Sequence, residues 1–211
     1  IGLGIPAEPL FRSASHSFAG MSAQNNDSKN IERYQQLLKL NHQSYETCSN
    51  EVTSWGFSLN ESEIINMFTL QMNPFVSNNA NDSTGFVLSV MDDKVIGMSL
   101  IVRGNDPLSM FARVQQFSDA QNAICEKEGY NDYVCAVKGS FKAKMPKTHD
   151  ELIELLNELD GKEVKQIVEM WKSPDKKVAA SLVYENKRFG KKKPRPDQNI
   201  ELTIALTDNR E

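Results

Sequence analysis

Two segments near the C-terminus carry the pattern that most restricts how this chain can fold. Apolar residues alternate with polar ones in both, at Val178, Ala180, Leu182 and Tyr184 in the first and at Ile200, Leu202, Ile204 and Leu206 in the second. A period of two places successive side chains on opposite faces of a β-strand. The two segments therefore predict antiparallel strands with one face in a core and the other face in water.

Further apolar, β-branched runs predict additional strands. Residues 86–91 and 95–102 are joined by the short polar sequence 92–94, which predicts a β-hairpin. Residues 133–143 are also typical of a strand. Residues 164–171 match both a helix and a strand, and the turn-forming residues 173–176 that follow favour the strand.

Helix signals occur before and between these runs. An apolar face with helical spacing runs from Ile31 through Cys48, and the helix that it predicts ends before Trp55. Ser58 and Glu61 form a capping box that predicts a second helix, which ends before Pro74. Its apolar side is formed by Ile64, Ile65, Phe68 and Met72.

Two more helices are predicted in the second half of the chain. Asp106 and Pro107 are an N-cap and a first-turn proline, and Gly129 is a C-terminal stop signal. Thr148 and Glu151 form another capping box. The helix that they open has one apolar face, made of Leu152, Leu155, Leu156 and Leu159.

These elements predict an α+β fold, with N-terminal helices followed by a mainly antiparallel sheet of about five or six strands and helices on one face. The predicted organisation is an extended or flexible arm over residues 1–30, a helical segment over 31–75 and an α+β domain over 85–211. The segment 76–85, rich in Asn, Ser and Gly, is predicted to be a loop between them. A single domain over 31–211 is the alternative, because 211 residues fit one large domain or two small ones.

The connection between the two C-terminal strands contains the most distinctive composition in the chain. Residues 186–196 include six cations, one aromatic residue and no acid. The whole chain has 24 Lys and Arg against 28 Asp and Glu, so 18 cations against 28 acids remain outside this run. A segregated positive charge on an acidic body indicates attraction to an acidic partner rather than a particular fold.

The hypothesis for function is therefore a non-catalytic interaction module, as a component of a larger assembly. It would contact an acidic partner, either nucleic acid or a protein, through a basic hairpin loop. Phe189 could stack on a base, and the charge would come from Lys187, Arg188, Lys191, Lys192, Lys193 and Arg195. A solvated loop that keeps the sheet soluble is the plainer explanation of the same residues.

Two other functions remain open from the sequence. One is an exported or periplasmic recognition protein in which Cys125 and Cys135 form a disulfide, which would leave Cys48 unpaired. The other is an enzyme of unrecognised type. The sequence does not indicate a cellular compartment.

The sequence contains no signature of a cofactor, a metal or a small-molecule site. His16, His42 and His149 are each isolated from other metal-ligating residues at ligand spacing. No nucleotide-binding or hydrolase motif occurs, and no apolar run is long enough to cross a membrane. These features argue against catalysis. The sequence predicts no catalytic residue, no metal ligand and no cofactor.

Overall fold

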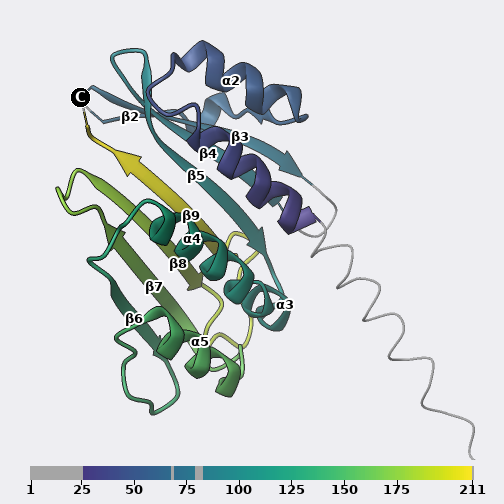
Figure 1. Cartoon of the computed structure of the whole chain (residues 1–211). Helices are drawn as coiled ribbons and strands as arrows, with labels where there is room; N and C mark the ends of the chain where they lie inside the picture. The colour runs from purple at the N-terminus through teal and green to yellow at the C-terminus, as the bar shows by residue number, and fades with distance from the viewer. Residues whose placement is uncertain (1–25, 68, 79–82, 211) are drawn as a thin grey trace, which may run out of the picture.

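The computed structural model describes residues 26–67, 69–78 and 83–210, and one antiparallel sheet forms the body of this part (Figure 1). The strands follow the order β1-β3-β4-β5-β9-β8-β7-β6, and β2 pairs with β3 beside β1. Their bounds are β1 Ser58–Leu59, β2 Ile65–Met67, β3 Leu70–Asn78, β4 Ser83–Met91, β5 Lys94–Gly104, β6 Val134–Gly139, β7 Val164–Lys172, β8 Val178–Asn186 and β9 Ile200–Asp208.

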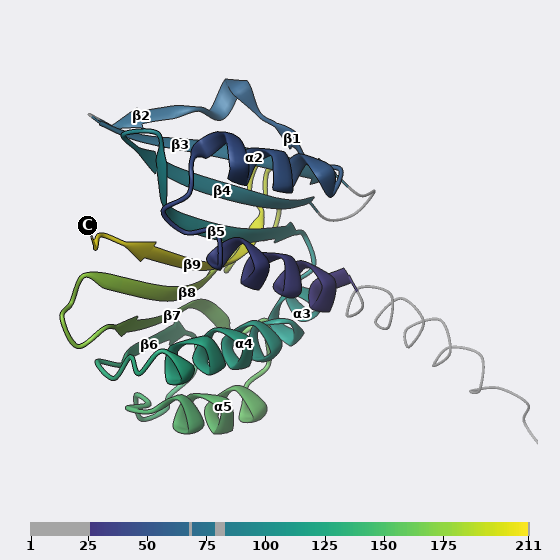
Figure 2. The same cartoon turned by 45° about the horizontal axis from the view of Figure 1, so that its top comes forward.

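The helices lie together on one face of this sheet (Figure 2). Residues 26–38 are helical, and this helix is followed by α2 (Tyr45–Ser54), α3 (Pro107–Ala112), α4 (Val114–Lys127) and α5 (His149–Glu158). A short 3₁₀ turn, η1 (Glu61–Glu63), separates β1 from β2. The structure is therefore α+β with a large antiparallel sheet, as the sequence predicts.

The core lies between the helices and the sheet. The register aligns Phe75, Phe86, Leu100, Ile204 and Leu182 in one row across five strands, and all five side chains are buried. Directly opposite residues of antiparallel strands point to the same face, so this row is continuous. It faces the helices, whose own buried residues belong to the same cluster.

Several local predictions are confirmed. The 92–94 sequence forms a tight hairpin between β4 and β5, with Asp92 and Asp93 at φ values of 51° and 62°. The Asp106 side chain accepts a hydrogen bond from the amide of Ser109, and the Thr148 side chain accepts one from the amide of Glu151. Residues 164–172 form a strand, and the two alternating C-terminal segments pair as antiparallel strands.

The second predicted helix is wrong. Ser58 lies in β1, Ile65 in β2 and Met72 in β3, so the segment from 58 to 78 adds strands to the sheet instead of a helix. Pairing of β3 with β4 buries Phe75 against Phe86, a long-range gain that overrides the local helical spacing. Phe68, the fourth residue of the predicted apolar side, lies outside the described residues.

Pro74 explains the interruption between β1 and β2. Leu59 pairs with Phe75, and Ile65 pairs with Met72, so η1 bulges out opposite residues 73 and 74 of β3. Proline has no amide hydrogen to donate to a neighbouring strand, and it is tolerated where the ladder is broken. The carbonyl of Pro74 still accepts a hydrogen bond from the amide of Asn60 at 2.7 Å.

Three other predictions need correction. The sheet has nine strands among the described residues rather than five or six. Residues 76–78 and 83–85 of the predicted loop are the end of β3 and the start of β4, and the rest of that predicted loop lies outside the described residues. The single helix predicted from Ile31 to just before Trp55 is two helices, separated at residues 39–44 by His42 at φ 64° and the N-cap Ser44, although its predicted end agrees with the end of α2 at Ser54.

The predicted arm over 1–30 falls largely outside the described residues. Its last part, residues 26–30, belongs to the first helix, so helical structure precedes Ile31. Asp27 is buried in this part and forms an ion pair with Arg113, which follows α3. This contact ties the beginning of the described chain to the helical layer.

Candidate functional site

The basic loop connects β8 and β9, two adjacent antiparallel strands at the centre of the sheet. Residues 187–199 form this connection, as the sequence predicts. In Figures 1 and 2 the loop lies at the end of the sheet near α3, on the side of the sheet away from the helices. A partner that binds this loop would therefore approach the sheet from the side opposite the helices.

Hydrogen bonds give the base of the loop a defined shape. The amide of Phe189 donates to the carbonyl of Asn186, and the amide of Lys187 donates to the carbonyl of Asn199. The side chain of Arg188 turns toward the protein, where its Nη1 donates to Asn105 Oδ1 at 3.0 Å and to the carbonyl of Gln198 at 3.2 Å. Arg188 thus joins the two arms of the loop to the end of β5.

The remaining five cations of the loop are exposed, but they differ in their acidic neighbours. Lys187 Nζ lies 3.9 Å from Glu185 Oε2, and Arg195 Nε lies 3.4 Å from Asp197 Oδ1. Lys191, Lys192 and Lys193 have no ion pair with any residue of the described chain. These three lysines are the part of the predicted site with charge that no protein group offsets, whereas Phe189 is half-buried.

Sequence reasoning missed a buried polar network between α4, α5 and β7. Its centre is the carboxylate of Glu169, whose side chain is 0% exposed. Ser118 donates a hydrogen bond to Glu169 Oε2 at 2.5 Å, and the Tyr133 hydroxyl donates to Oε1 at 2.9 Å. His149 Nδ1 lies 3.2 Å from Oε1, and its Nε2 lies 3.1 Å from Asp119 Oδ1.

His149 carries a perturbed pKa because of these neighbours. Burial lowers the pKa of His149, but the hydrogen bonds and negative charges of Glu169 and Asp119 raise it by more, so the net pKa lies above its ordinary value. His149 is also the first residue of α5, where its position is set by the Thr148 cap. The sequence contained one signal of the network, which is that Glu169 interrupts the apolar face of residues 164–171.

The network is suited to holding elements together rather than to nucleophilic catalysis. The hydroxyl of Ser118 directs its proton to Glu169, which fixes the serine inside the protein. Three donors around one buried carboxylate satisfy a group that would otherwise be costly to bury. Since the donors come from α4, from the residue before β6 and from α5, the network links these parts of the chain to β7.

All three cysteines are free thiols in the structure, so the Cys125–Cys135 disulfide of the alternative hypothesis is not formed there. Burial is the main cause that raises the pKa of Cys48 and Cys135 to about 11 and that of Cys125 to about 12. A thiol reacts as its thiolate, and these pKa values leave little thiolate at neutral pH. The three thiols are therefore poor nucleophiles.

Within the described residues, no group of three or more His, Cys, Asp or Glu side chains could hold a metal ion. The helices in the described ranges are too short or too polar to cross a membrane. Comparison of the sequence and the structure with protein families, curated proteins and solved structures gave no match.

Proposed function

We propose that this chain is a non-catalytic interaction module, a component of a larger assembly, that contacts an acidic partner through the loop between β8 and β9. The partner is either nucleic acid or an acidic protein surface. The observation that carries this proposal is the group of three consecutive lysines, Lys191 to Lys193, which are exposed and have no acidic partner in the described chain.

The shape of the loop supports this role. Arg188 fixes the loop base to Asn105 and Gln198, and the amide of Lys191 donates to the carbonyl of Arg188. Pro194 and Pro196 flank Arg195 and limit its backbone freedom. An ordered base and restricted backbone lower the conformational entropy that the loop loses on binding.

The charge distribution supports the same role. The loop holds six of the 24 cations in a chain with 28 acids, so its positive field is surrounded by an acidic body. Such a distribution orients a polyanion toward one place and disfavours contact elsewhere. Lys187 and Arg195 would also contact the partner, although each would first have to release its ion pair with Glu185 or Asp197.

Binding to polyanions at graded salt concentrations tests the proposal. The probes are a fluorescent 20-base-pair DNA duplex, a 20-nucleotide single-stranded RNA and poly-glutamate. If the three lysines neutralise three phosphates of the duplex, the logarithm of affinity falls with the logarithm of salt concentration with a slope of about −2.7. Affinity then falls about 40-fold between 50 and 200 mM NaCl.

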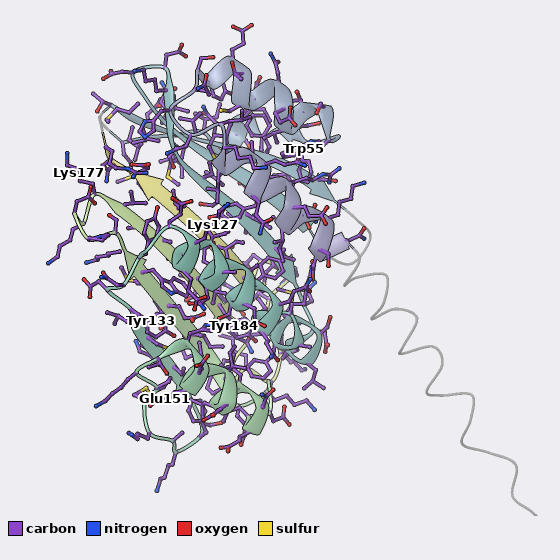
Figure 3. The ribbon with its side chains drawn as sticks, in the orientation of Figure 1. Trp55, Lys127, Tyr133, Glu151, Lys177 and Tyr184 are labelled. Carbon is purple, nitrogen blue, oxygen red and sulfur yellow. The ribbon has the colours of Figure 1, made fainter. Side chains whose placement is uncertain are left out.

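The decisive comparison uses two variants with the same change in net charge. Lys191→Glu/Lys192→Glu/Lys193→Glu should weaken binding and flatten the salt dependence. The control, Lys39→Glu/Lys127→Glu/Lys177→Glu, changes three exposed lysines that lie outside the loop, two of which are labelled in Figure 3. Lys177 precedes β8, so it is separated from the loop by the length of that strand, about 30 Å.

Three results would contradict the proposal. The first is absence of binding to all three probes at 50 mM NaCl. The second is an unchanged affinity and salt slope in the loop variant. The third is an equal loss in the loop and control variants, which would assign the effect to net charge and not to the loop.

A further inference from the structure

Two adjacent rows on the outer face of the sheet, opposite the helices, have an unusual composition. One row of residues paired across seven strands runs Val76, Gly85, Ile101, Thr203, Val183, Val168 and Ala136. The adjacent row runs Pro74, Val87, Ser99, Ala205, Ser181, Met170 and Val134. Neither row contains a charged residue, although the face of a sheet that is in contact with water normally carries polar side chains.

This outer face is hollowed over β3, β4 and β5. A pocket of about 500 Å³ lies there, in the size range of small-molecule sites. Its floor includes Gly85, which has no side chain between Val76 on one side and Ile101 on the other. A Cβ atom at Gly85 would lie 2.8 Å from the carbonyl oxygen of Phe75, so close strand packing excludes a larger residue.

One wall of the pocket is formed by the edge of the sheet. Residues 62–65, in and after η1, line this side because the chain bulges out opposite Pro74. Ile64 and Ile65 are exposed by 37% and 51% and contribute an apolar border. The wall makes the site a half-enclosed hollow, which admits a narrow group more readily than the flat face of a second protein.

The opposite side of the pocket carries a cation. Arg103 donates its Nε hydrogen to Glu201 Oε2 at 2.8 Å, and its side chain is 36% exposed. Its Nη1 and Nη2 atoms make no hydrogen bond with the described residues, so both are able to donate to a ligand. Glu63 is the acid in the pocket lining, but it lies beyond β3 and β4, about 14 Å away across the strands.

We propose that this pocket binds a small amphipathic anion, with an apolar chain and a carboxylate. The chain would lie over Gly85 between Val76 and Ile101, and the carboxylate would accept hydrogen bonds from the Nη atoms of Arg103. Charge complementarity assigns the anionic end to Arg103 and the apolar end to the border at Ile65. None of the lysines of the basic loop lines this pocket, so the proposal does not rest on them.

Titration calorimetry with decanoate tests the pocket, and 1-decanol and decyltrimethylammonium test the charge preference. Decanoate should bind with one site per chain and at least tenfold more tightly than 1-decanol, and the cation should bind more weakly than either. Equal affinity for decanoate and 1-decanol would overturn the role of Arg103. Absence of decanoate binding would overturn the site.

Filling the pocket locates the binding. Val76→Phe places an aromatic ring beside Gly85, an arrangement that sheets accept because the ring covers the glycine. This variant, and Ile101→Phe as a second one from the opposite strand, should weaken decanoate binding at least tenfold. Val183→Phe is the matched control, since Val183 lies in the same row outside the pocket. Equal weakening in Val183→Phe would overturn the location.

The charge is tested separately. Arg103→Gln/Glu201→Gln removes the pair without leaving Glu201 unpaired, and it should lower the affinity for decanoate at least tenfold, to that of 1-decanol. Lys138→Gln, which removes a cation from the same transverse row on β6, should leave the affinity unchanged. Sedimentation of all variants supplies the last check. A dimer that Val76→Phe dissociates would show that a second copy covers this face, which would overturn the proposal.

Discussion

Two tyrosines with opposite hydrogen-bonding situations allow a sharp test of how the buried network contributes to stability. Tyr133 donates its hydroxyl to Glu169 Oε1 at 2.9 Å. The Tyr184 side chain is fully buried, and its hydroxyl has no hydrogen-bond partner in the described part of the chain. Both are labelled in Figure 3. The same substitution, Tyr to Phe, should therefore change stability differently at the two positions.

Tyr133→Phe removes one of the donors around a carboxylate that is 0% exposed. A hydrogen bond to a charged group contributes about 1.5 to 3 kcal/mol. Because Tyr133 itself is half-buried and water has partial access, the loss should be about 1.5 to 2 kcal/mol. For a chain of this length the melting temperature should fall by about 3 to 8 °C. The phenyl ring keeps its packing on Trp171, whose ring centre is 5.4 Å away.

Tyr184→Phe removes a hydroxyl that is buried without a partner. Burying such a group costs free energy, so its removal should leave the free energy of unfolding unchanged or raise it by about 1 kcal/mol. The edge-to-face contact with Phe111, with ring centres 6.2 Å apart, does not depend on the hydroxyl. The substitution therefore isolates the polar atom, as it does at Tyr133.

Chemical denaturation at pH 7, followed by circular dichroism, measures both changes. A common slope with denaturant concentration in the three proteins would show that the unfolded states are comparable. The reasoning fails if Tyr133→Phe is as stable as the unmodified chain, or if Tyr184→Phe loses as much stability as Tyr133→Phe. The first result would mean that the carboxylate of Glu169 gains nothing from this donor, and the second that the loss at Tyr133 cannot be assigned to the hydrogen bond.

Two further predictions concern ionisation and backbone strain. The pKa of His149 is raised in the folded protein, so the stability that its protonation supplies is complete below the unfolded pKa of about 6.5 and is lost as pH rises through the folded pKa. The stability advantage of the unmodified chain over His149→Gln should therefore shrink in denaturation curves recorded from pH 6 upward, and a constant advantage would contradict the assignment. Asp93→Gly should raise the free energy of unfolding by about 0.5 to 1 kcal/mol, because glycine adopts φ 62° without strain. Asp132→Gly, an exposed control outside the positive-φ positions, should lower the free energy of unfolding in the same denaturation measurement.

Local sequence signals correctly predicted the elements that depend on interactions between residues close together in the chain. The caps at Asp106 and Thr148 work through a side chain and an amide three residues apart, so a few residues of sequence contain the whole interaction. The Asp92-Asp93 turn is local in the same sense. The alternation of residues 178–184 and 200–206 predicted their burial because both strands have one dry face and one wetter face.

The segment from 58 to 78 shows why other predictions failed. Its apolar residues have helical spacing, and Pro74 follows as an apparent stop signal. In the structure Pro74 lies within β3, opposite the break between β1 and β2, and Phe75 packs in the row that also contains Phe86 and Leu100. These contacts join residues distant in sequence, and no local pattern reveals them.

The sequence by itself determined the α+β class, the helix caps, the C-terminal strand pair and the concentration of cations in the loop that joins that pair. These depend on periodicity, on contacts over three or four residues and on composition. Tertiary structure alone decided which lysines remain without acidic partners, that Glu169 is surrounded by Ser118, Tyr133 and His149, and that Gly85 is the floor of a pocket beside Arg103. The physical reason is that burial and pairing across a sheet depend on the register of strands far apart in the chain, and that register is set by packing of the whole core.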